Sequence, residues 1–300
     1  MANSSEKLEP HGKRRLGFNF DQFKTSCPGS SKNPIPNNWL EWFVGYFEGD
    51  GTFISRNKSF TFCIYSIHKD CLEEIKLTLG FGTINYNKEH NKYTYLVEKR
   101  ENIFLLLTIL NGNLVLNHRF DQFIKVANDF NIKLFRGKDS PNKLIISSEK
   151  VLPGINDAWL SGFIDAEGHF GLPIEKGRKF IPYYISITFE IGQNGEEWLF
   201  YHLKDIFKGG IVKISKYKEE HSPRSHAKNI NHSRIIFKGI KLGKNPVTLL
   251  FDYFDKYPIK VKKRIYDEWR DIHKSLLNKD HLNPLKLSKL VLRSEKLNDR

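Results

Sequence analysis

The feature that most constrains this chain is a stretch that occurs twice. The first copy, WLEWFVGYFEGDGTF, runs from Trp39 to Phe53, and the second, AWLSGFIDAEGHFG, runs from Ala158 to Gly171. The copies align without a gap, and each ends in an acid, a small residue, a second acid and glycine. Two such copies in one chain predict a duplicated domain, with one helix of this kind in each repeat.

Each copy predicts a helix that is buried on most sides, because nearly every position before the acids is apolar or small. Gly45 and Gly49 lie four residues apart, as do Gly162 and Ala166, so each helix carries a stripe of small residues on one face. Glycine inside a helix costs about 1 kcal/mol relative to alanine. The stripes therefore predict that two helix backbones approach each other closely.

If these stripes pack on each other, Asp50 and Glu167 emerge together from two helix C-termini. The negative ends of both helix dipoles and the mutual repulsion of the acids disfavour two carboxylates there. A pair so placed is explained if divalent cations lie between the acids, and the alternative is two solvated acids at helix ends. Gly51 and Gly168 follow the acids and are expected to end the helices in the left-handed conformation.

The composition favours a polyanionic partner. Lys and Arg number 48 against 34 Asp and Glu, which gives a net charge of +14. Nucleic acid is the commonest partner of such a chain, although an anionic membrane or simple solubility would also fit the charge. The most apolar stretch, residues 103–110, is too short to span a membrane. The first twenty residues lack the apolar core of a signal peptide.

Two further compositional features bear on the compartment. The three cysteines are widely spaced and fit neither a disulfide framework nor a zinc site, which indicates reduced thiols and an intracellular location. The only methionine is the first residue, and Asn, Lys, Ile and Phe are abundant. This bias indicates an AT-rich coding sequence, such as an organellar one.

The order of periodic segments predicts an α+β fold made of two pseudo-symmetric αββαββα repeats, each with a four-stranded antiparallel sheet. The predicted segments are an N-terminal arm (1–36), a first repeat (37–130), a linker (131–153), a second repeat (154–278) and a basic tail (279–300).

Smaller features of these segments can also be predicted. Aromatic residues at 18, 20 and 23 are expected to pin the arm to the surface. Asn37 or Asn38 is expected to cap the first signature helix. A short strand is expected at 144–146, and a terminal helix at 285–296. In the first repeat the strand alternation places Phe60, Phe62 and Ile64 on one face, and Ser59, Thr61, Cys63 and Tyr65 on the other.

The paired stretches resemble the signature helices of the LAGLIDADG homing endonucleases in their single-chain, two-repeat form. The resemblance covers residues 37 to 277. It implies that Asp50 and Glu167 bind the catalytic metal ions, with Mg²⁺ as the cofactor and Mn²⁺ or Ca²⁺ able to substitute for binding. The backbone carbonyls of Gly49 and Ala166 are expected as further metal ligands.

Three more catalytic candidates follow from the resemblance. The segment FEIGQ, which ends at Gln193, is similar to a family segment whose glutamine lies beside the metals, and its counterpart in the first repeat falls near Ser66. The segment PIKVKK is similar to the one that carries an active-site lysine, here Lys262 or Lys263, and Arg119 is the counterpart in the first repeat. An ordinary surface cation is the alternative at these helix starts.

One face of each sheet is expected to contact DNA, because its polar residues are of the types that read base edges in the major groove. A solvated sheet face is normally polar as well, which is the alternative interpretation. The candidates are Arg56, Lys58, Ser59, Thr61, Tyr65, Asn85, Asn87, Thr94, Tyr184, Ser186, Thr188, Glu190, Lys213, Ser215 and Arg234. His221, His226 and His232 could bind zinc, contact the DNA backbone or face solvent.

The resulting hypothesis is a monomeric, site-specific endonuclease that recognises a long asymmetric target in double-stranded DNA. The resemblance implies metal-dependent hydrolysis of both strands with short 3′ overhangs, and an intron-encoded, mitochondrial origin. An RNA-splicing maturase on the same scaffold, with host intron RNA as its partner, is the first alternative. A transcriptional regulator is the second, but neither terminus has room for the extra helix-turn-helix domain that it would need.

Overall fold

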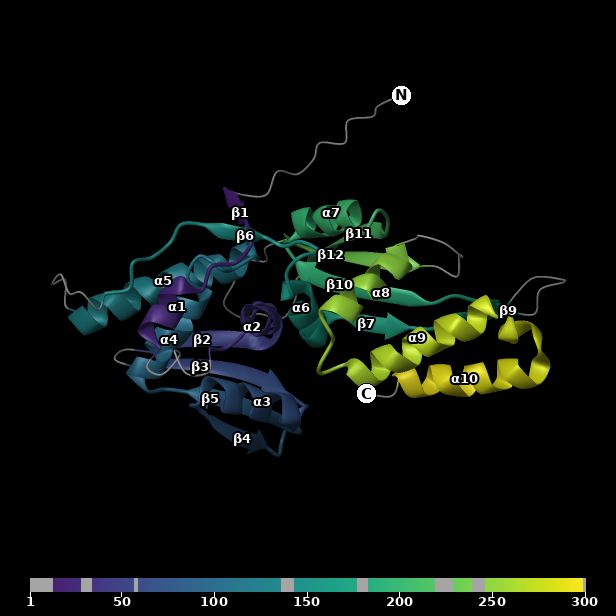
Figure 1. Cartoon of the computed structure of the whole chain (residues 1–300), viewed down its shortest axis with the longest axis horizontal. Helices are drawn as coiled ribbons and strands as arrows, with labels where there is room; N and C mark the ends of the chain where they lie inside the picture. Colours follow the sequence, from purple (N-terminus) through teal and green to yellow (C-terminus); the bar gives the residue numbers. More distant parts are fainter. Residues whose placement is uncertain are drawn as a thin grey trace, which may run out of the picture. The chain divides into compact units, whose positions relative to one another are not determined.

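The computed structural model describes residues 13–27, 34–56, 59–135, 143–176, 183–218, 229–238 and 246–298 (Figure 1). They form two compact units, a first unit up to Ala166 and a second unit from Glu167 onwards. Among these residues, no helix is long and apolar enough to cross a membrane. The α+β class and the two four-stranded antiparallel sheets are as predicted.

The first unit contains the first repeat, in the predicted order. Its elements are α2 (Asn37–Asp50), β2 (Gly51–Arg56), β3 (Ser59–Ser66), α3 (Lys69–Leu79), β4 (Thr83–Asn87), β5 (Lys92–Val97), α4 (Arg100–Leu110) and α5 (Asn117–Phe135). The antiparallel sheet has the strand order β2-β3-β5-β4, and Figure 1 shows these strands side by side. Two helices, α4 and α5, follow the last strand and together close the predicted αββαββα unit.

The core of this unit lies on one side of the sheet, because alternate strand residues are apolar. Phe62, Ile64 and Tyr95 are fully buried, and they pack with the helices that cover this side. The alternation predicted for β3 is correct except at Cys63, which lies on the polar side but is only 3% exposed.

The second unit repeats this topology. Its elements are β7 (His169–Gly171), β10 (Thr188–Asn194), α7 (Glu197–Ile206), β11 (Ile211–Lys218), β12 (Asn229–Lys238), α8 (Pro246–Lys256) and α9 (Lys263–Leu277). The strand order β11-β12-β10-β7 matches that of the first sheet when the strands are taken in chain order. The signature helix α6 (Trp159–Glu167) precedes β7, and all but its last residue belongs to the first unit.

The second unit also differs from the first. In this unit the two-residue alternation predicts strands at 169–174 and 181–191. The structure divides each of them, and β8 (Ile174–Lys176) and β9 (Tyr183–Ile185) form a separate two-stranded hairpin. After α9 come a 3₁₀ helix, η1 (Asp280–Leu282), and the predicted terminal helix, α10 (Pro284–Asn298).

The described part of the N-terminal arm has regular secondary structure. It forms β1 (Arg14–Leu16) and α1 (Asp21–Ser26), and it is anchored by Phe20 and Phe23, each 2% exposed. Strand β1 pairs in parallel with β6 (Lys150–Leu152). The strand predicted at 144–146 is wrong, because these residues form no strand. Helix α5 continues five residues into the predicted linker, to Phe135.

Two expectations about the ends of α2 are wrong. The N-cap is Pro36 rather than Asn37 or Asn38, and it makes no side-chain capping bond. Gly51 has φ −92°, not a left-handed conformation, and Gly168 likewise lacks a positive φ. Gly51 is needed for a different reason, because a Cβ there would lie 2.1 Å from the ring of Phe47.

Candidate active site and nucleic-acid interface

The two signature helices pack through glycine. A Cβ on Gly45 would lie 2.1 Å from the carbonyl oxygen of Trp159, and a Cβ on Gly162 would lie 1.8 Å from that of Trp42. Contacts below 3.0 Å are essentially never seen for real Cβ atoms. Both positions therefore require glycine, and the predicted close approach of the two helices is confirmed at these residues.

Reciprocal hydrogen bonds accompany this packing. Trp42 Nε1 donates to Asp165 Oδ2 at 2.9 Å, and Trp159 Nε1 donates to Glu48 Oε2 at 2.6 Å. Glu48 is fully buried and Asp165 is 2% exposed. Because a buried carboxylate without partners is costly, each tryptophan makes the acid on the opposite helix tolerable.

Glu48 is held by more than the tryptophan. Its Oε1 accepts the backbone N–H groups of Val115 at 3.0 Å and Leu116 at 2.7 Å, in the connection that leads into α5. Burial raises the pKa of Glu48 to about 8, although the N–H donors and the charge of Arg119 act in the opposite direction. This acid thus joins α2, α6 and the start of α5 at one buried point.

The end of α2 carries a cation beside the first motif acid. Arg119 Nε donates to the carbonyl oxygen of Glu48 at 2.8 Å, and Nη2 donates to that of Gly49 at 3.0 Å. These carbonyls lack partners within the helix, and a cation there complements the helix dipole. Asp50 is the next residue and is partly exposed. Arg119 therefore fixes the backbone that presents Asp50, and its bond to Gly49 O engages a carbonyl predicted to bind metal.

Ser66 is buried, and its hydroxyl oxygen is hydrogen-bonded within the first unit. Tyr46 Oη donates to Ser66 Oγ at 3.0 Å, and the same oxygen accepts the backbone N–H of His68 at 3.1 Å. Burial raises the pKa of Tyr46, with smaller contributions from Cys71 and Asp50. Ser66 thus links α2 to the end of β3.

In the second unit a lysine lies beside the end of the signature motif. Lys262 Nζ donates to the carbonyl oxygen of Gly168 at 2.7 Å. Gly168 directly follows Glu167, and Glu167 is partly exposed. Lys263 instead pairs with Asp267 on the surface of α9. Of the two lysines considered from the sequence, Lys262 is the one that contacts the end of the motif. Its catalytic role stays a prediction.

Gln193 is the counterpart of Ser66, as the strand registers indicate. Phe53 pairs with Phe62 in the first sheet and Phe170 pairs with Phe189 in the second, and Ser66 and Gln193 each lie four residues after the paired phenylalanine. Strand alternation places Gln193 on the same side of the sheet as Phe189, which faces the buried core. Gln193 is partly exposed, because it lies near the end of the strand. Its catalytic role also stays a prediction.

The first sheet brings most of its predicted DNA contacts to one face. The registers pair Arg56 with Ser59, and Tyr65 with Thr94 and, one strand further, Asn85. The predicted residues on this open face are Arg56, Ser59, Thr61, Tyr65, Asn85, Asn87 and Thr94. All of them are exposed or partly exposed. Lys58 lies outside the described residues.

The second sheet also has an open polar face. It carries Thr188, Glu190, Lys213, Ser215 and Arg234, each exposed or partly exposed. Arg234 Nη1 donates to Glu190 Oε1 at 2.8 Å across adjacent strands.

Two DNA-contact candidates of the second repeat, Ser186 and Tyr184, are not placed on this face. Ser186 lies between β9 and β10, outside the four-stranded sheet, and its N–H donates to Pro173 O at 3.2 Å. Tyr184 belongs to the β8–β9 hairpin, and its side chain lies outside the described residues. Of the three histidines considered for zinc, His221 and His226 also lie outside them. His232 Nδ1 lies 2.8 Å from Asn194 Oδ1.

Sequence reasoning missed several residues. Thr52, Thr83 and Lys92 share the open face of the first sheet, and the same two-residue alternation extended along each strand would have found them. The buried pair of Glu48 with Trp159 was also missed. Its signal is in the aligned copies, which place a tryptophan and a first acid at matching positions.

The comparisons with known proteins agree with this architecture. A family model described as LAGLIDADG endonuclease matches residues 160–273. A probable intron-encoded endonuclease 4 of Neurospora crassa is 30% identical over 256 residues. Residues 160–273 therefore belong to the LAGLIDADG endonuclease family by sequence. The crystal structure of the LAGLIDADG meganuclease I-CpaMI bound to uncleaved DNA has the same fold, with a TM-score of 0.64 at 16% identity.

The extent of these LAGLIDADG matches differs. The I-CpaMI alignment covers 87% of this chain and 99% of that one. The Neurospora alignment covers 83% of this chain but 43% of the relative, so the chain spans less than half of that protein's length. The intron-encoded RNA maturase bI4 of Saccharomyces cerevisiae is 28% identical over 175 residues, which cover 57% of this chain and 24% of the maturase.

Proposed function

We propose that this LAGLIDADG protein is a site-specific endonuclease that cuts both strands of a long, asymmetric DNA target. One observation carries the proposal. Each signature motif retains its final acid, Asp50 or Glu167, and a cation binds backbone carbonyls beside it, Arg119 in the first unit and Lys262 in the second.

The donor set suits a hard divalent cation. Asp50 and Glu167 are partly exposed carboxylates, and oxygen ligands are those that Mg²⁺ prefers. Among the described residues, no three His, Cys, Asp or Glu side chains gather into a metal site. In this proposal the ions would be held by the two acids together with the carbonyl of Ala166, that of Gly49 and phosphate oxygens of DNA. Mg²⁺ held there would supply an activated water and stabilise the leaving oxygen.

The protein's own groups do the positioning. Arg119 holds the last carbonyls of α2 and so fixes the direction in which Asp50 leaves the helix. Lys262 does the same for Gly168 after Glu167. Both cations also lower the local negative potential, which favours the approach of a phosphate. Gln193 is proposed to orient a water near the same site.

DNA binding is assigned to the open faces of the two sheets, where exposed Asn, Thr, Ser, Lys and Arg side chains can reach base edges. The net charge of +14 supports contact with many phosphates. DNA bending would add specificity beyond the direct contacts. The repeats 37–130 and 154–278 are proposed to read one half-site each, with the chain acting as a monomer.

The cleavage pattern and the origin complete the proposal. Cuts on the two strands would leave short 3′ overhangs, as the resemblance to homing endonucleases implies. The intron-encoded relative in Neurospora and the AT-rich coding bias support an intron origin in a mitochondrial genome.

The test is cleavage of DNA that contains the uninterrupted junction of the sequences flanking the coding region. The purified chain with Mg²⁺ should linearise a plasmid carrying this junction at one position, and end sequencing should show 3′ overhangs. A plasmid with a scrambled junction is the control. Equal cutting of both plasmids, or none, would reject the proposal.

An RNA-splicing maturase is the second candidate, favoured by the similarity to the maturase bI4. A splicing assay with the host intron RNA distinguishes the two. A maturase alone would promote splicing without cutting the junction plasmid, and its splicing would survive loss of Asp50 and Glu167.

A further inference from the structure

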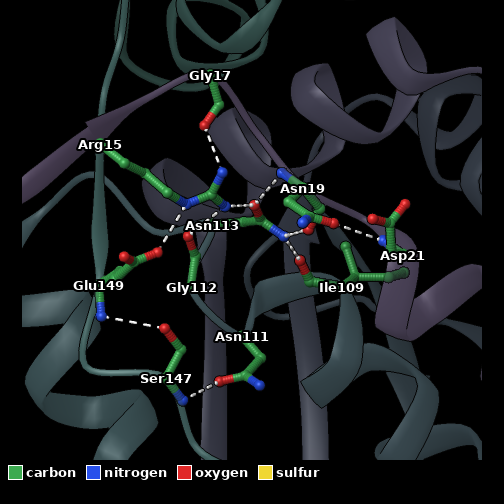
Figure 2. Close-up of polar contacts among 10 residues, drawn as sticks. All are labelled: Arg15, Gly17, Asn19, Asp21, Ile109, Asn111, Gly112, Asn113, Ser147 and Glu149. Atoms are coloured by element: carbon green, nitrogen blue, oxygen red, sulfur yellow. Dashed lines mark hydrogen bonds and ion pairs between the residues drawn. The ribbon is translucent and has the colours of Figure 1, made fainter.

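The N-terminal arm is bonded to the connection between α4 and α5 (Figure 2). Arg15 Nη2 donates to the carbonyl oxygen of Gly112 at 2.9 Å and to Asn113 Oδ1 at 2.8 Å. Asn113 Nδ2 donates in turn to the carbonyl oxygen of Asn19 at 2.7 Å, and Asn113 itself is fully buried. Arg15 also pairs with Glu149 at 3.3 Å. Through these contacts the α4–α5 connection is bonded to the arm, and the arm is bonded to the segment before β6.

Arg14 contacts the same connection closer to α5. Its Nη1 donates to the carbonyl oxygens of Val115 at 2.6 Å and Val151 at 3.0 Å, and its Nη2 donates to Asn117 Oδ1 at 2.9 Å. Lys150 Nζ donates to the same Asn117 oxygen at 2.7 Å. Asn117 is the first residue of α5, so Arg14 bridges the arm, β6 and the start of that helix.

The peptide that Arg14 holds also carries the donors to the buried acid. Val115 accepts from Arg14 through its carbonyl oxygen and donates to Glu48 through its N–H. Arg119, two residues after Asn117, binds the carbonyl oxygens of Glu48 and Gly49. A continuous series of hydrogen bonds therefore runs from Arg14 to the residue that precedes Asp50.

From this geometry we infer that Arg14 is a positioning residue of the endonuclease, acting through Val115 and Glu48 on the backbone that presents Asp50. The inference rests on the proposed function. Its effect is directed at the first motif acid, since in the second unit Lys262 contacts Gly168 O directly from the start of α9. Loss of Arg14 should therefore slow one strand cut more than the other.

The test uses the full-length chain with Arg14→Ala, the conservative Arg14→Lys and the control Lys13→Ala. Lys13 carries the same charge on an exposed side chain one residue earlier. Single-turnover cleavage of a supercoiled target plasmid separates nicked from linear product, and equilibrium binding to the same target is measured in Ca²⁺.

With Arg14→Ala we expect cleavage to slow by at least about tenfold, since small displacements of catalytic groups are costly. Nicked plasmid should accumulate, while target affinity stays within about threefold of the wild type. Arg14→Lys should keep part of the wild-type cleavage rate, and Lys13→Ala should keep all of it. The inference would be overturned if Arg14→Ala cut both strands at the wild-type rates. It would also be overturned if both cuts slowed equally and target affinity fell with them.

Hydrogen exchange gives a readout that does not need activity. In Arg14→Ala, exchange should quicken by about tenfold in peptides that cover 111–119 and the end of α2, and remain unchanged in β10–β12. If the wild type cuts no DNA but these peptides respond, the proposed function fails while the positioning role stands. Unchanged exchange at 111–119 would overturn the positioning role whether or not the chain cuts DNA.

Discussion

Trp159 Nε1 lies 2.6 Å from Glu48 Oε2, which joins the second signature helix to the first at a fully buried carboxylate. The same carboxylate accepts two backbone N–H groups at the start of α5. The motif therefore contains two kinds of acid. The first acid of each copy is a buried structural group, and the last is partly exposed and available for chemistry.

Glu48 should make stability depend on pH. Its folded pKa of about 8 lies above the ordinary value of 4.5, so protonated Glu48 stabilises the fold. That contribution is complete below pH 4.5 and is lost as the pH rises through about 8. Relative to Glu48→Gln, the wild type should therefore lose on the order of a few kcal/mol of unfolding free energy across this range. Denaturant unfolding of both proteins from pH 5 to 8.5 measures the difference. If the unfolding free energies of the two proteins changed in parallel with pH, the pKa of Glu48 would not be raised by folding.

Gly45→Ala should destabilise the protein strongly, because the added methyl group meets the backbone of Trp159 at 2.1 Å. Overpacking costs about 1–3 kcal/mol even where side chains can move, and a backbone oxygen cannot move aside easily. Gly45→Leu should be worse. Gly154→Ala is the matched control, since its Cβ would make only ordinary contacts, the nearest at 3.6 Å. Equal midpoints of thermal unfolding for the two alanine variants would contradict this helix packing.

Much of the fold follows from local pattern. The duplicated stretch predicts both signature helices and their glycine contact, because only close backbone packing explains Gly45 and Gly162 at matching positions. Period-two segments predict the strands that place Arg56, Tyr65 and Asn85 on one face. The helices and strands depend on neighbours in sequence, and the contact between the two helices is predicted because the same pattern of small residues occurs twice.

Other features depend on distant partners and could not be predicted. The bond between Trp159 and Glu48 and the contact of Arg14 with Val115 join segments far apart in the chain. The sequence predicts a left-handed conformation at Gly51, but the constraint there is the ring of Phe47, which only the folded helix end reveals. A tertiary contact, not a backbone preference, selected glycine there.

Binding to the target should weaken steeply with salt. A chain of net charge +14 that neutralises at least about six phosphates should give a slope of roughly −5 or steeper in a plot of log affinity against log salt. Fluorescence anisotropy with a labelled target duplex between 50 and about 200 mM salt measures the slope. A nearly flat affinity would assign the charge to solubility instead of DNA contact.

The chain should bind its target as a monomer, because both signature helices lie in one polypeptide. The halves have also diverged: Arg119 corresponds to Lys262, Ser66 corresponds to Gln193, and the second unit adds the β8–β9 hairpin. An asymmetric target uses these differences. Light scattering on the complex and selection from a randomised target library check the prediction, and a dimer on a palindrome would refute it.

The measurement closest to the central claim is cleavage of the junction target by Asp50→Asn and Glu167→Gln beside the wild type. Both variants should lose double-strand cleavage, because each removes a carboxylate proposed to hold the metal ions. Their affinity for the target should stay within about tenfold of the wild type, since the repulsion between the acids is relieved as metals are lost. Full double-strand cleavage by either variant would show that the last acids of the motifs are not the active site.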